Sequence, residues 1–226
     1  MPMTQLLTDR GHAKISGDSM PVAEEIAWPE SIPNLFRAVA SSAFPIFLDS
    51  ARFDPQMGRY SYFSGFPFET IRSRDGQVEV RDSGNRPVFS GTTDPFVVLA
   101  ERLGRYSLQT ISGLPPFQGG AAGLFSYDLC HHVERLPRAR HDEFAVPNML
   151  VGLYDWVIAL DHLLGRAWII STGSPHSGAK RLEHARAQIE RVRMICGDSA
   201  NDGQSDELSR VTRSASGEWT IAPENS

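Results

Sequence analysis

Residues 151–172, VGLYDWVIALDHLLGRAWIIST, decide the fold class of this chain. Two apolar runs lie within this stretch, WVIAL at 156–160 and AWII at 167–170, and a short turn at 161–166 separates them. We interpret the whole stretch as one β-hairpin, because short apolar runs joined by a short turn are typical of paired strands. Both faces of each run are apolar, which predicts strands in the middle of a sheet that is covered on each side.

Further strands are expected upstream of this hairpin. Residues 69–81 predict a second hairpin, because Asp75-Gly76 is a residue pair that the type I′ turn favours. Residues 45–48 (PIFL) form a short apolar run, and residues 59–63 (RYSYF) are rich in aromatic side chains, so both segments are typical of strands.

Two helices are predicted from capping signals and apolar spacing. Asp94 can accept hydrogen bonds from the free amide groups at a helix start, and Pro95 suits the first turn. The expected apolar stripe of this helix consists of Phe96, Leu99 and Leu103. The second helix covers residues 179–195, and its charged side chains, Arg181 among them, are expected to be mostly solvated. Its apolar face consists of Leu182, Ala185, Ile189 and Val192.

The fold class that follows is α+β, with mixed or antiparallel sheets and covering helices, because hairpins dominate over parallel crossover units. We expect residues 1–25 to be a flexible N-terminal arm, residues 26–196 to form the ordered domain, and residues 197–226 to be a flexible tail. The arm shows no sustained apolar period, and the tail carries too few apolar residues to offset the entropy lost on ordering.

Composition and charge exclude several classes of function. The chain has 226 residues and a formal net charge of −5, whereas a general nucleic-acid binder needs a basic surface. Two cysteines, Cys130 and Cys196, cannot form a disulfide framework, and no apolar run approaches the roughly 20 residues that cross a bilayer. The N-terminus lacks the apolar core of a secretory signal, so we expect a cytoplasmic protein that binds neither nucleic acid nor membranes.

Residue chemistry alone predicts no catalytic residue and no metal site. Cys130, His131, His132 and Glu134 lie too close in sequence to share one metal ion, and no CxxC or HExxH pairing accompanies them. The glycine-rich segment 118–123 (QGGAAG) lacks the order of a phosphate-binding loop. We therefore interpret its small residues as a means of close packing between strands.

Two polar segments near strand ends remain open to interpretation. Asp49 and Ser50 follow a predicted strand, where such a pair either lines a pocket or ends the strand in a turn. Arg59, Tyr60 and Ser61 place a cation and two hydroxyl groups on another strand, an arrangement that is more often structural than functional.

Several separated motifs occur in the order found in one enzyme family. They are FLDSA at 47–51, GRYS at 58–61, LPPFQGGAAGLFSYDL at 114–129, ERLP at 134–137, PNM at 147–149 and GLYDW at 152–156. Over about residues 32–172 the chain resembles the component I family of chorismate-utilising synthases. The resemblance is greatest to component I of 4-amino-4-deoxychorismate (para-aminobenzoate) synthase, and anthranilate synthase component I is the nearest sibling.

The resemblance implies part of an enzyme, because it covers only the N-terminal half of the family's chain. The other half holds chorismate, Mg²⁺ and the acid/base residues. We therefore expect a non-catalytic N-terminal domain with no cofactor of its own, and Mg²⁺ only in the absent chorismate-binding half. The full enzyme aminates chorismate to 4-amino-4-deoxychorismate for para-aminobenzoate and folate synthesis, and a glutamine amidotransferase, component II, supplies the ammonia.

The resemblance also implies a ligand pocket and half of a four-layer α/β/β/α sandwich. In this family the N-terminal half binds tryptophan. The positions that match this tryptophan-type pocket are Ser50, Gly58, Arg59, Tyr60 and Ser61. Asp49 stands where the anthranilate type has Glu. Two alternatives stay open, namely a stand-alone module that binds tryptophan or the amidotransferase, and a fragment of anthranilate synthase component I.

Overall fold

The computed structural model describes residues 20–50, 52–137, 145–198, 211–213 and 219–221, and most of its strands form two large sheets. The strand order in the first sheet is β1 (Val22–Ile26), β10 (Arg166–Ser171), β9 (Trp156–Asp161), β3 (Tyr60–Ser64) and β2 (Ile46–Leu48). The order in the second sheet is β6 (Pro87–Thr92), β5 (Gln77–Asp82), β4 (Glu69–Arg74), β8 (Met149–Tyr154) and β7 (Gly120–Phe125). Neighbouring strands in both sheets are antiparallel, which confirms the predicted α+β class with antiparallel sheets.

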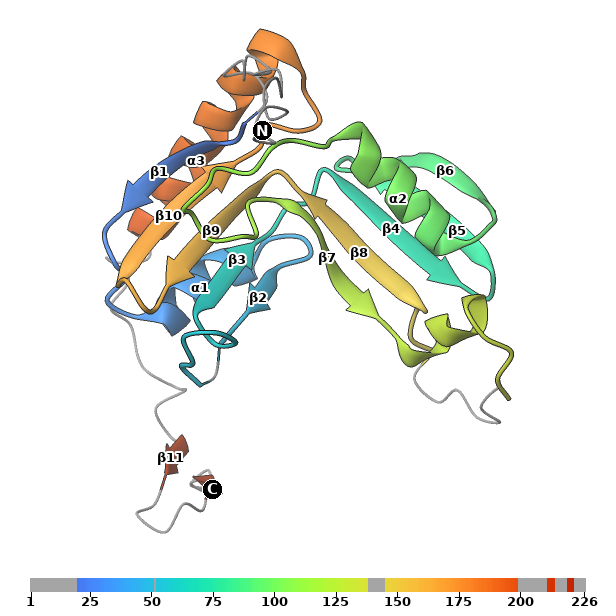
Figure 1. Ribbon diagram of the computed structural model, residues 1–226, viewed down its shortest axis with the longest axis horizontal. Coiled ribbons are helices and arrows are strands. Elements are labelled where there is room, and N and C mark those ends of the chain that lie inside the picture. The colour runs from blue at the N-terminus through green and yellow to red at the C-terminus, as the bar shows by residue number, and fades with distance from the viewer. Residues whose placement is uncertain (1–19, 51, 138–144, 199–210, 214–218, 222–226) are drawn as a thin grey trace, which may run out of the picture.

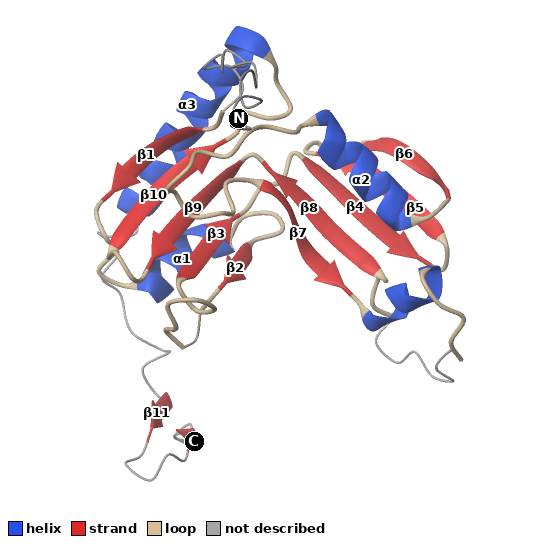
Figure 2. Cartoon of the chain, viewed as in Figure 1, coloured by secondary structure: helices blue, strands red, loops and turns tan. Residues whose placement is uncertain are grey.

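Helices cover one face of each large sheet. α1 (Ile32–Ala40) and α3 (Gly178–Asp198) pack on the first sheet, and α2 (Pro95–Arg105) packs on the second. A short 3₁₀ helix, η2 (Tyr127–His132), follows β7. Figure 1 shows that the two sheets lie close together at one end, where β8 passes into β9, and diverge toward the other end. Figure 2 shows the helices on the flanks of these two blocks of strands.

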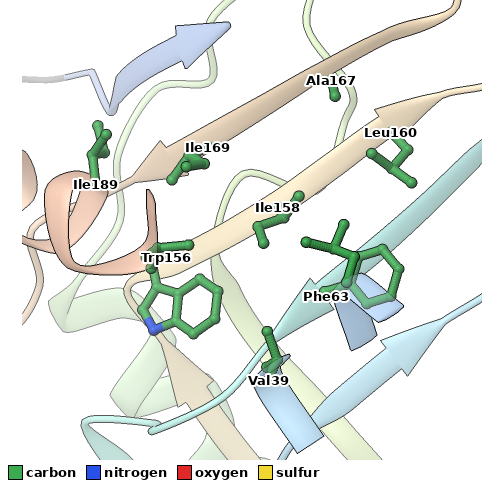
Figure 3. Close-up of a cluster of buried hydrophobic side chains, with 10 residues drawn as sticks. Val39, Phe63, Trp156, Ile158, Leu160, Ala167, Ile169 and Ile189 are labelled. Atoms are coloured by element: carbon green, nitrogen blue, oxygen red, sulfur yellow. The ribbon is translucent and has the colours of Figure 1, made fainter. Parts of the chain in front are cut away.

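One hydrophobic core lies between the first sheet and the helices α1 and α3. Figure 3 shows its side chains, among them Val39, Phe63, Trp156, Ile158, Leu160, Ala167, Ile169 and Ile189. On the opposite face of the same sheet, Val157 and Trp168 belong to a separate cluster that Phe117 partly covers. Because successive side chains of a strand point to opposite faces, β9 and β10 contribute to both clusters. The prediction of central strands covered on each side is therefore confirmed.

The two predicted hairpins are present. β9 and β10 pair from Trp156 opposite Ser171 to the turn at 162–165. β4 and β5 are joined by Asp75 and Gly76, whose φ angles of 51° and 80° are the left-handed values that a type I′ turn requires.

The extent predicted for the 151–172 hairpin is wrong. Residues 151–154 belong to β8, which pairs with β4 and β7 in the second sheet. The chain changes sheet at Asp155, whose carboxylate is only 1% exposed. This carboxylate accepts a hydrogen bond from Nε2 of Gln188 at 3.1 Å and lies 3.0 Å from Nε2 of His184. These polar contacts between Asp155 and α3 therefore hold the chain at the point where it passes from the second sheet to the first.

The ordered structure also reaches beyond the expected domain limits. Residues 22–25 of the expected arm belong to β1, because β1 pairs with the free edge of β10 and Glu25 forms an ion pair with Arg166. α3 continues to Asp198, and within the expected tail β11 (Val211–Arg213) pairs with β12 (Trp219–Ile221). Residues 1–19, 199–210, 214–218 and 222–226 of the predicted arm and tail lie outside the described residues.

The helices differ from the predictions in which side chains they bury. α1 has no counterpart among the predicted helices, although Ser31 caps it by accepting a hydrogen bond from the backbone N–H of Asn34 at 3.3 Å. In α2 the predicted cap Asp94 is confirmed, because its Oδ1 accepts from the N–H of Phe96 at 2.8 Å. The predicted stripe is confirmed for Leu99, which packs on the core of the second sheet, and is wrong for Phe96 and Leu103, which are 37% and 38% exposed. Arg102 is buried instead, against Glu69.

The side of α3 that faces the first sheet is largely as expected. Ala185, Ile189 and Val192 are buried. Arg181, which was expected to be solvated, is buried as well, because its Nη1 donates to the carbonyl of Thr172 at 2.8 Å.

Candidate functional site

The ends of β2 and β3 are joined by two hydrogen bonds from Ser50. The chain leaves β2 through Asp49 and Ser50, so these residues meet the start of β3. Ser50 Oγ donates to the carbonyl of Tyr60 at 2.5 Å, and the backbone N–H of Ser50 donates to Ser61 Oγ at 3.1 Å. The strand end is thus held rigidly, and the Ser50 hydroxyl has a defined direction.

The Ser61 hydroxyl is the centre of a small polar cluster. It is fully buried and donates to Oδ1 of Asp49 at 3.0 Å. Nε2 of His162, the residue that follows β9, lies 2.8 Å from the same oxygen. The His162 ring is placed by its backbone N–H, which donates to the carbonyl of Arg59 at 2.9 Å, and by an edge-on contact with Trp28.

A cavity of about 420 Å³ opens above this cluster. Its lining consists of Ile32, Pro33, Phe36 and Arg37 of α1 together with Phe47, Asp49, Ser50 and His162. Phe36 and Phe47 stack with ring centroids 5.1 Å apart and form an apolar wall. Such a volume lies within the range of about 300–1,000 Å³ that small-molecule sites occupy. An apolar wall with a few polar groups is the usual composition of such a site.

The five residues predicted for the pocket have different positions in this arrangement. Ser50 lines the cavity, and the buried Ser61 does not line it but forms hydrogen bonds with the lining residues Ser50 and Asp49. Tyr60 contributes its carbonyl, whereas its ring packs with the cluster on the opposite face of the sheet, near Tyr62. The structure therefore brings Ser50, Ser61 and the Tyr60 carbonyl together at one site.

Arg59 points to an acidic partner in the same sheet. Its Nε and Nη2 donate to the two carboxylate oxygens of Asp161 at 3.0 and 2.6 Å, and Asp161 is 2% exposed. Burial alone would raise the pKa of Asp161, but hydrogen bonds from Arg59 and from the N–H groups of Leu164 and Leu163 outweigh it and lower this pKa. The Arg59 charge is thus neutralised within the protein.

Gly58 closes the turn that leads into β3. Its N–H donates to the carbonyl of Asp54 at 2.9 Å, and Oδ1 of Asp54 accepts from the N–H groups of Gln56 and Met57. A Cβ at position 58 would lie 2.1 Å from the carbonyl oxygen of Arg52, so only glycine fits. Gly58 and Arg59 therefore support the site and do not line its cavity.

Of the eight residues that line the cavity, only Ser50 is among the predicted site residues; the others are Ile32, Pro33, Phe36, Arg37, Phe47, Asp49 and His162. Phe36 and Arg37 belong to α1, and its start signal is visible in the sequence as Ser31 followed by Ile32-Pro33. His162 comes directly after an apolar strand, as Ser50 does, but no pattern in the sequence places the two strand ends side by side.

The other segments considered for chemistry are structural where the structure describes them. His131 lies 3.9 Å from Asp128, while the His132 ring lies edge-on to Phe96. A Cβ at Gly123 would lie 2.2 Å from the carbonyl oxygen of Leu150, which supports the close-packing interpretation of the glycine-rich segment.

The donor sets within the described ranges do not fit a metal ion, because no three His, Cys, Asp or Glu side chains converge there. None of the helices in the described part of the chain combines the length and apolar character that crossing a bilayer requires.

Comparison with known proteins shows that the chain is similar to component 1 of two synthases. The chain is 31% identical over 144 residues to aminodeoxychorismate synthase component 1 of Escherichia coli strain K12, covering 63% of this chain and 31% of that protein. It is 29% identical over 153 residues to anthranilate synthase component 1 of Acetivibrio thermocellus, covering 67% of this chain and 31% of that protein. These relatives confirm the resemblance indicated by the motifs, and the chain spans about one third of their length.

Anthranilate synthase component I from Streptococcus pneumoniae TIGR4 is a solved structure with similarity to this chain. The TM-score is 0.47 at 22% sequence identity, and the match covers 63% of this chain and 31% of the other. No family model matches the sequence.

Proposed function

We propose that this chain is the N-terminal, non-catalytic part of a component I of the aminodeoxychorismate synthase type. Similarity to component 1 of both synthases over about a third of their length supports this assignment. Together with a chorismate-binding half, the protein would aminate chorismate to 4-amino-4-deoxychorismate, and Mg²⁺ would belong to that other half.

The role proposed for this part is to bind an aromatic amino acid, with L-tryptophan as the first candidate. The observation that carries it is the composition of the 420 Å³ cavity. Asp49 and Ser50 offer oxygen acceptors for an ammonium group, and Arg37 offers a guanidinium for a carboxylate. The stacked rings of Phe36 and Phe47 offer an apolar surface to an aromatic side chain.

Isothermal titration of the purified chain with L-tryptophan tests this role. We expect saturable binding, and Ser50→Ala should weaken it about tenfold because one hydrogen bond to a charged group is lost. Ser83→Ala, in an exposed turn far from the cavity, is the matched control and should leave binding unchanged. Absence of heat and of any thermal shift with the unaltered chain would sink the ligand proposal.

The proposed lack of catalysis and the proposed partner need separate tests. Chorismate with Mg²⁺ and ammonium should remain unconsumed when the purified chain is the sole protein present; turnover would place an active site within these residues. The proposed partner is a glutamine amidotransferase, component II. Co-purification with such a protein, with and without a chorismate-binding half, decides whether this part of component I contributes to the contact.

A further inference from the structure

His162 lies outside all the sequence motifs, yet its imidazole contacts the hydroxyl at the centre of the candidate site. Nε2 of His162 lies 2.8 Å from Ser61 Oγ, and His162 is one of the residues that line the cavity. The backbone N–H of His162 donates to the Arg59 carbonyl, and the imidazole meets the Trp28 ring edge-on, with the ring centroids 5.5 Å apart and an interplanar angle of 77°. Its position is thus fixed before any ligand arrives.

The hydrogen count at Ser61 determines which atom carries the proton. A serine hydroxyl has one proton and two acceptor lone pairs. The one proton of Ser61 is donated to Oδ1 of Asp49, while the backbone N–H of Ser50 donates to Ser61. Nε2 of His162 must therefore carry a hydrogen and donate it, which fills the second lone pair of Ser61.

The consequence for the cavity is that its polar end offers acceptors. The Ser50 hydroxyl donates its one hydrogen bond to the Tyr60 carbonyl, so the lone pairs of Ser50 Oγ remain as acceptors for a ligand. Oδ2 of Asp49 has no hydrogen-bond donor among the residues that the structure describes. Two neighbouring acceptors match a primary ammonium group, which has three donors and no acceptor.

We propose that His162 is a positioning residue that sets the preference of this cavity for ligands with an amino group. His162 acts through Ser61, because the Ser61 hydroxyl, which His162 holds in place, also forms hydrogen bonds with Asp49 and Ser50. Without the imidazole N–H, Ser61 lacks one partner, and the Asp49 carboxylate and the Ser50 backbone lose a common anchor. The inference rests on the amino-acid site proposed above.

Titration with two indole ligands separates this role from a general structural one. L-tryptophan carries the amino group, and indole-3-propionate has the same ring and carboxylate without it. The unaltered chain should prefer tryptophan. His162→Leu should reduce this preference about tenfold, the loss expected for one charge-assisted hydrogen bond. His162→Gln, whose amide N–H can still donate to Ser61, should restore much of it.

A control variant and three contrary outcomes complete this test. His176→Leu alters an exposed histidine that does not line the cavity and should change neither affinity. Equal weakening of both ligands by His162→Leu, or an unchanged preference, overturns the positioning role while the site itself stands. An unaltered chain that binds neither ligand overturns the amino-acid site and this inference with it. Should His162→Leu fail to fold, Ser61→Ala carries the same prediction.

Discussion

A buried ion pair joins α2 to the second sheet and makes a strong prediction about stability. Nη1 of Arg102 lies 3.3 Å from Oε1 of Glu69, and the hydroxyl of Tyr106 donates to the same oxygen at 3.1 Å. Arg102 is 6% exposed and Glu69 is 7% exposed. Within the described part of the chain, Oε2 of Glu69 and Nε of Arg102 have no hydrogen-bond partner. The pair is thus desolvated but incompletely satisfied.

Removing one partner should cost far more than removing both. Arg102→Met leaves the Glu69 carboxylate buried without its cation, so the free energy of unfolding should fall by about 3–5 kcal/mol. The double variant Glu69→Leu/Arg102→Met removes both charges and fills the space with apolar groups. Because the native pair leaves two polar atoms unpaired, the double variant should lie within about 1 kcal/mol of the unaltered chain or be more stable.

Urea unfolding followed by circular dichroism measures these differences as shifts of the midpoint at constant m value. Arg105→Met is the matched control, because it removes an exposed arginine that pairs with Glu101 in the same helix. That change should cost less than about 1 kcal/mol. A double variant as unstable as the sum of its single changes would refute the reasoning, since additive effects would mean that the charges of Glu69 and Arg102 are not coupled.

Three further outcomes follow from local geometry. The pKa of Asp161 is lower in the folded chain than in the unfolded chain. The ionised carboxylate therefore stabilises the fold fully at a pH above its unfolded-state pKa, and this stabilisation is lost as the pH falls through its folded-state pKa. Asp161→Asn should therefore lower the free energy of unfolding, measured in urea, most at pH 7 and less below about pH 4. Gly123→Ala places a Cβ 2.2 Å from a backbone oxygen of β8 and should lower the free energy of unfolding by about 1–3 kcal/mol, whereas Gly104→Ala, with open space, should raise it by about 0.5–1 kcal/mol. Burial raises the pKa of the Cys196 thiol to about 11, so in a Cys130→Ser background a thiol reagent at pH 8 should react roughly 100-fold more slowly with the folded chain than in urea.

The features that could be predicted from the sequence are those that depend on neighbours along the chain. The turn at Asp75-Gly76 and the cap at Asp94 need only a few adjacent residues, and both are confirmed. Burial of Arg102 and Arg181 could not be predicted, because each guanidinium is buried by a partner on a distant strand or corner. The change of sheet at Asp155 likewise depends on side chains of α3.

The candidate site shows the same division between local and distant information. The sequence places Ser50 at a strand end, which is a local property, but leaves open whether that end is a pocket or a turn. The pocket exists because α1 lies over the end of β2 and because β3 pairs with β9. His162 is 101 residues away from Ser61 and meets it only through that pairing. No spacing rule along the chain connects positions so far apart.

The motif GRYS at 58–61 supports the cavity from outside its lining. It resembles part of a ligand pocket, yet none of its four side chains lines the cavity. Gly58 closes the turn, Arg59 holds the carboxylate of Asp161, and Ser61 ties Asp49, Ser50 and His162 together. Because Asp161 precedes His162 directly, the ion pair with Arg59 also helps to fix where the imidazole stands. Substitutions in this motif should therefore act on ligand binding through the geometry of Asp49, Ser50 and His162.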